Sequence, residues 1–71
     1  MTMDQLRSAV AHRLYEQAYA PVRGWEEERV VADTWADLVC ILGEEEAQVH
    51  AVSECVEMLE MHRACVEVDC V

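Results

Sequence analysis

The sequence predicts an all-α fold, a small bundle of three helices. Three observations predict it. Apolar residues recur at spacings of three and four in three successive segments. The one Pro and two Gly stand between those segments, at positions 21, 24 and 43. Runs of carboxylates stand where the second and third segments begin, as is favoured in a first helical turn. A chain of 71 residues forms one domain, spanning 1–71.

The first helix is expected over about 3–19. Thr2 can cap it, and Gln5 stands three residues later, at the spacing of a capping box. Pro21 and Gly24 follow and end the segment. Its apolar stripe consists of Met3, Leu6, Val10 and Leu14.

The second helix is expected over about 25–42 and the third over about 44–67, with Gly43 between them as a left-handed residue that closes a helix. Apolar stripes mark the buried side of each helix. The second stripe is Val31, Trp35, Leu38 and Leu42; the third is Val49, Val52, Val56, Leu59 and Val66, widened by Ala47, Ala51, Cys55, Met58, His62 and Cys65. Of these we predict that the core contains Leu38, Leu42, Val52, Val56 and Leu59.

An alternative architecture follows from a regular spacing that runs through Gly43. From Val31 to Cys70, positions separated by four and three residues are apolar except for Glu45 and Arg63. One long helix in a dimeric coiled coil, with the first helix beside it, would show this pattern. Gly43 and the carboxylates after it favour a break instead. The wide apolar arc also predicts a homodimer.

The charge of the chain is strongly asymmetric. Residues 1–23 carry three Arg against Asp4 and Glu16, a net charge of +1, whereas residues 24–71 carry thirteen carboxylates against Arg29 and Arg63, a net charge of −11. Such a field repels nucleic acid and anionic membrane and attracts basic protein surfaces.

We therefore expect a non-enzymatic protein-binding module that occupies a basic, nucleic-acid-binding surface of a partner protein and so inhibits it. In size and charge the chain is similar to phage-encoded inhibitors of bacterial defence systems, anti-CRISPR proteins included. Tyr15 and Tyr19, one helical turn apart, are candidate hot spots. The candidate partner-binding carboxylates are Glu26, Glu27, Glu28, Asp33, Asp37, Glu44, Glu45, Glu46, Glu54, Glu57 and Glu60.

Two further functions remain open: a structural adaptor or homodimerisation module whose acid keeps it soluble, and a metal-binding helical protein. The metal candidates are Cys55, His62, Cys65 and Cys70, whose first three members share one helical face. Cysteines at these spacings are more typical of small core residues, so no metal or other cofactor is expected. No Gly-rich phosphate loop or catalytic motif occurs, and neither a signal peptide nor a membrane span is recognisable, so we expect a cytoplasmic protein that is not an enzyme.

Overall fold

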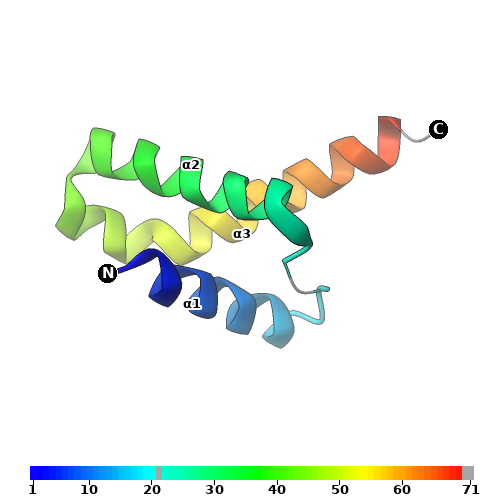
Figure 1. Cartoon of the computed structure of the whole chain (residues 1–71), viewed down its shortest axis with the longest axis horizontal. Coiled ribbons are helices and arrows are strands. Elements are labelled where there is room, and N and C mark those ends of the chain that lie inside the picture. Colours follow the sequence, from blue (N-terminus) through cyan, green and yellow to red (C-terminus); the bar gives the residue numbers. More distant parts are fainter. Residues whose placement is uncertain (21, 70–71) are drawn as a thin grey trace.

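The computed structural model describes residues 1–20 and 22–69, and their side chains as far as residue 65. Within them the chain forms three helices, α1 (Met3–Glu16), α2 (Gly24–Leu42) and α3 (Glu44–Asp69), which confirms the predicted three-helix bundle. α2 and α3 form an antiparallel hairpin, and α1 packs mainly on α3, with much less contact to α2 (Figure 1). The bundle is elongated, about 40 × 23 × 18 Å.

α1 begins as predicted and ends early. The Thr2 hydroxyl accepts a bond from the Gln5 N–H at 3.2 Å, and the Gln5 side chain accepts one from the Thr2 N–H at 3.0 Å. The expected end near residue 19 is wrong, because Ala18 has a positive φ of 60°. This turn lets the Tyr19 N–H donate to the Leu14 carbonyl at 2.9 Å, a bond that closes the helix at Glu16.

Gly43 separates α2 from α3, so the single long coiled-coil helix is wrong. Its φ of 84° was expected, but its ψ of 162° is extended rather than left-handed helical. The Gly43 N–H donates to the Val39 carbonyl, and its own carbonyl accepts from Ala47 at 2.9 Å. One residue therefore ends α2 and begins α3.

The core lies where all three helices meet, and its burial corrects part of the predicted set. Val56 and Leu59 are buried as predicted, while Leu38 and Val52 are half-buried against the core. Leu42 was predicted as core but is exposed, because the hairpin turn ends the bundle there. Val49, Met58 and Cys65, expected on the buried side of α3, are exposed as well. The buried cluster is Leu6, Val10, Leu14, Val31, Ala51, Cys55, Val56 and Leu59.

Candidate protein-binding surface

The outer face of α2 carries a column of carboxylates. Glu26, Asp33 and Asp37 are all exposed, and their spacing of seven and four residues places them on one side of the helix, opposite the buried Val31. From the first to the last they span about 16 Å along the helix axis. Arg29 lies beside the column and contacts Asp33, with 3.8 Å between Nε and Oδ2. Because α2 is held on the core by its opposite face, the column is presented on a rigid element. We call these three residues the α2 column.

The carboxylates of α3 are more scattered. Glu44, Glu45 and Glu46 are exposed in the first turn, where carboxylates interact favourably with the helix dipole. Glu57 is exposed further along, whereas Glu54 and Glu60 are half-buried. In the antiparallel hairpin, the triplets at 26–28 and 44–46 lie at opposite ends, because each opens a helix (Figure 1).

Glu27 is not part of any exposed acidic surface, which corrects its selection as a partner-binding residue. Its side chain is only 5% exposed and accepts two bonds from Arg63, at 2.8 Å from Nε and 2.9 Å from the terminal Nη2. It also accepts a bond from the Arg23 backbone N–H at 2.6 Å. The bond from Arg63 lowers the pKa of Glu27, against the opposing effect of burial. Glu27 therefore stays ionised inside the bundle and serves the fold.

The ion pairs that the other arginines form neutralise only a few of the surface carboxylates. Arg7 contacts Asp4 within α1 and reaches Glu28 of α2 at 3.5 Å. Counting Arg29 and Arg63, three of the five arginines in the sequence are bonded to carboxylates. Among the carboxylates whose side chains the structure describes, most therefore have no arginine partner.

The aromatic candidates lie near one end of the bundle. Tyr15 is in the last turn of α1 and Tyr19 follows it; both are exposed. Trp25, in the first turn of α2, is 68% exposed and was not selected from the sequence. Trp35, by contrast, packs against the core. Exposed Trp and Tyr are the residue types enriched in interface hot spots.

The three thiol and histidine candidates that the structure describes do not form a metal-binding cluster. Cys55 is buried, and its Sγ lies 3.8 Å from the Val31 carbonyl oxygen. Burial, with a smaller effect of Glu54, raises the pKa of the Cys55 thiol to about 11, so the thiol stays protonated at neutral pH. Cys65 is exposed and His62 half-buried, while Cys70 lies outside the described residues. Among the side chains that the structure describes, those of residues 1–20 and 22–65, no three His, Cys, Asp or Glu lie close enough together to hold a metal ion.

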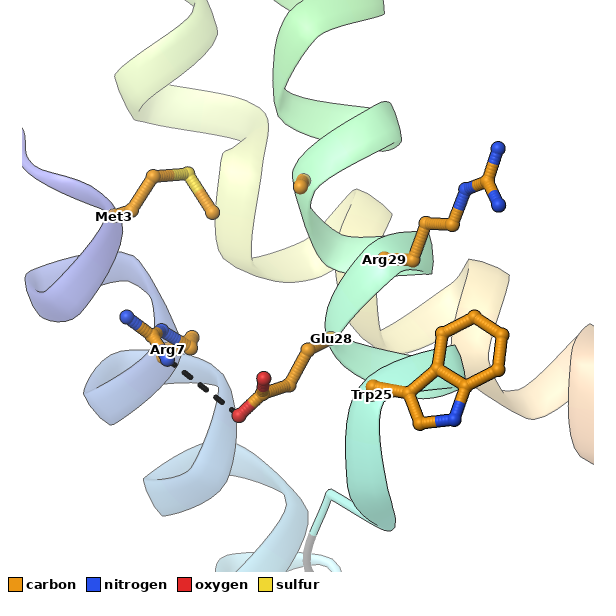
Figure 2. Close-up of a pocket in the computed structure, with 6 residues that line it drawn as sticks. Met3, Arg7, Trp25, Glu28 and Arg29 are labelled. Carbon is orange, nitrogen blue, oxygen red and sulfur yellow. Dashed lines mark hydrogen bonds and ion pairs between the residues drawn. The ribbon is translucent and has the colours of Figure 1, made fainter.

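A shallow groove lies between α1 and α2, because both helices pack mainly on α3 and make fewer contacts with each other. One part, of about 340 Å³, is lined by Met3, Trp25, Arg29 and Ala32; a second, of about 290 Å³, by Ser8, Ala11 and Val22. The Arg7–Glu28 contact lies between α1 and α2 and lines both parts (Figure 2). Sequence reasoning missed this groove, since it depends on how the helices pack.

No protein-family model, curated protein or solved structure gives a significant match to the chain. Nor does any helix in the described part of the chain combine the length and apolar character needed to cross a membrane.

Proposed function

We propose that the protein is a non-enzymatic binding module that occupies a basic surface of another protein. The observation that carries the proposal is the α2 column: Glu26, Asp33 and Asp37, exposed on one side of a helix that the core holds in place. A rigid row of charges loses little freedom on binding, and a net charge of −10 accelerates encounter with a cationic partner.

Solubility alone accounts poorly for this surface. A soluble surface normally mixes both signs of charge, whereas this chain has fifteen carboxylates, no Lys and five Arg. The self-repulsion of so many like charges destabilises the compact state. A partner rich in Arg and Lys would relieve that repulsion. If the partner's surface normally binds DNA or RNA, this protein competes for the same basic residues, because phosphate contacts dominate nucleic-acid affinity. Binding then inhibits the partner.

The proposal is tested by recovering partners on immobilised protein and comparing the wild type with a variant lacking the α2 column, Glu26→Gln with Asp33→Asn and Asp37→Asn. We expect basic, nucleic-acid-binding proteins to be recovered by the wild type, lost with the variant, and displaced by added duplex DNA. Recovery of the same proteins by the variant, or no displacement by DNA, contradicts the proposal.

A homodimerisation module is the second candidate function, and the hairpin turn favours it. Ile41 is 78% exposed in the last turn of α2, and Val49 is 75% exposed near the start of α3. With Leu42, which is also exposed, they leave apolar area near one end of the bundle. Sedimentation at tens of micromolar tests this candidate: a dimer of the 8.1 kDa chain that dissociates on Ile41→Ser with Val49→Ser supports it, and a monomer removes it.

A further inference from the structure

The distal half of α3 carries sulfur and nitrogen donors on one face. Met58, Met61, His62 and Cys65 stand at positions i, i+3, i+4 and i+7 of the helix. Residues three and four apart are neighbours on a helix surface, with Cβ atoms roughly 5–6 Å from each other. Met58 and Cys65 therefore each lie beside both Met61 and His62. We call these four residues the α3 sulfur patch.

The α3 sulfur patch is accessible, and its donors are not engaged elsewhere. Met61 is 62% exposed and Met58 41%, while Cys65 is exposed and His62 half-buried. Among the described residues, no hydrogen bond or ion pair involves the imidazole of His62 or the thiol of Cys65. α3 has 26 residues against 19 in α2, and its distal part extends beyond the hairpin (Figure 1). A ligand therefore reaches the patch without opening the bundle.

The chemistry of these donors favours a soft metal ion. Thioether and thiolate sulfur select Cu(I), and imidazole also suits copper. Zinc is held instead by thiolates, imidazoles and carboxylates. The burial of Cys55 leaves the zinc-type set considered from the sequence incomplete. Met58 and Met61, in contrast, add two exposed thioethers to His62 and Cys65 and make a set suited to Cu(I).

Carboxylates beside the α3 sulfur patch make its surroundings attractive to a cation. Glu54 and Glu57 stand four residues before Met58 and Met61, on the same side of the helix. Glu57 is exposed and Glu54 half-buried. The guanidinium group of Arg63, which would oppose a cation, points away from the patch because it is bonded to α2.

From these observations we propose that the α3 sulfur patch binds one Cu(I) ion. The S–H bond of Cys65 breaks, its proton passes to solvent, and the thiolate binds the metal together with the thioether of Met61 one turn before it. Met58 and His62 flank this pair and complete the set of donors. Copper stays Cu(I) throughout, so no oxidant or reductant is consumed. This site is separate from the proposed binding of a basic partner, because no residue of the α2 column belongs to it.

Titration of the purified protein with Cu(I), without oxygen and in competition with a chromophoric Cu(I) chelator, tests the proposal. We expect one tightly bound ion per chain. The variant Met58→Leu with Met61→Leu keeps the side-chain volume and the helix propensity but removes both thioethers. It should bind Cu(I) at least about tenfold more weakly than the wild type, and Cys65→Ser should weaken binding as well.

Cys40→Ser is the matched control. Cys40 is also an exposed thiol, but the residues three and four positions from it are Ala36, Asp37, Gly43 and Glu44, which provide no soft donor. Its removal should leave the affinity for Cu(I) unchanged.

Nuclear magnetic resonance of the methionine methyl groups gives a second measurement that needs no substitution. The sequence contains four methionines, two of them near the N-terminus. At saturation, Cu(I) should shift the methyl signals of Met58 and Met61 and leave those of Met1 and Met3 in place.

Several results would overturn the proposal. If the double leucine variant binds Cu(I) as tightly as the wild type, thiols alone account for the binding. Equal losses in Cys40→Ser and Cys65→Ser, methyl signals of Met58 and Met61 that do not move, or no binding of Cu(I) at all would contradict it equally. None of these results bears on the binding of a basic partner, which the α2 column variant tests separately.

Discussion

The Glu27–Arg63 pair joins the first turn of α2 to a residue 36 positions further along the chain. Both side chains are largely buried, 5% and 14% exposed, so each charge depends on the other to offset its loss of hydration. The parallel two-bond geometry suits a guanidinium group, and the Arg23 N–H provides a further bond to the same carboxylate. This pair holds the distal part of α3 to the start of α2.

Removing one partner should therefore destabilise the fold. Arg63→Met leaves an ionised carboxylate buried without its counter-charge, and we expect a loss of about 3–5 kcal/mol in the free energy of unfolding. The double variant Glu27→Met with Arg63→Met should recover most of that loss, because no buried charge remains. Urea denaturation measures both. A single variant as stable as the wild type would show that the pair contributes nothing.

The same pair predicts a pH dependence. Because the pKa of Glu27 is lowered in the folded state, the unfolded chain binds a proton more readily than the folded one. The stability contributed by Glu27 is thus fully present above its ordinary pKa of 4.5 and is lost as the pH falls below that value. Urea midpoints between about pH 6 and pH 3 should fall more steeply for the wild type than for Glu27→Gln. Parallel curves would contradict this assignment.

Residue positions were predicted best where burial follows from the helical stripe alone. Val56 and Leu59 lie mid-stripe and are buried, whereas Leu42 lies beside the hairpin turn and is exposed. Val49 is exposed because it lies on the opposite side of α3 from the buried Ala47 and Ala51. The burial of Glu27 had a signal: it stands four residues before Val31 on the stripe of α2, and Arg63 interrupts the apolar spacing of α3. Pairing the two required the antiparallel arrangement of those helices.

At the scale of the helices, the residues that cap and connect them determine where each helix begins and ends. The start of α1 and the break at Gly43 were predictable, because a capping box and a glycine before a carboxylate run are local signals. The end of α1 was not. It depends on Ala18 at φ 60°, a conformation in which Gly is the usual residue and which costs an L-residue about 1–2 kcal/mol.

Ala18→Gly should consequently stabilise the protein. Relief of the positive φ outweighs the greater freedom of glycine in the unfolded chain, and we expect a gain of about 0.5–1 kcal/mol. Ala36→Gly, at an exposed position within α2, is the matched control and should lose about 1 kcal/mol. Thermal melts of the two variants should shift in opposite directions; a destabilised Ala18→Gly would refute the helix end described above.

Gly43→Ala should act in the opposite sense. With φ 84° and ψ 162°, Gly43 occupies a region essentially restricted to glycine, so a side chain there costs about 1–3 kcal/mol even though space is available for a Cβ. The strain favours a continuous helix through residue 43, and the regular apolar spacing from Val31 onward would then support self-association. Denaturation together with sedimentation measures this change. Unaltered stability would mean that the turn does not need glycine.

At the scale of the whole molecule, the three-helix bundle could be predicted because apolar periodicity needs no tertiary information. The charge asymmetry could be read directly from the sequence. The sequence did not predict the groove between α1 and α2, which exists because α1 packs mainly on α3 and makes fewer contacts with α2. Nor did it separate the exposed α2 column from the buried Glu27, since both belong to one acidic segment. The proposal that this surface binds a basic partner therefore combines the charge of the sequence with the exposure of the α2 column in the structure.

The most direct test of that proposal is the dissociation constant for a synthetic helical peptide, with Leu on one face and Lys elsewhere, measured across a salt series. Two variants of equal net charge are compared with the wild type. One lacks the α2 column, and the other carries Glu16→Gln, Glu46→Gln and Glu57→Gln at exposed sites on α1 and α3. We expect binding to weaken steeply with salt, and the column variant to lose most of the affinity and of the salt dependence, chiefly through slower association. Equal losses in the two variants would leave only a general charge effect, and unchanged affinity in the column variant would contradict the proposal.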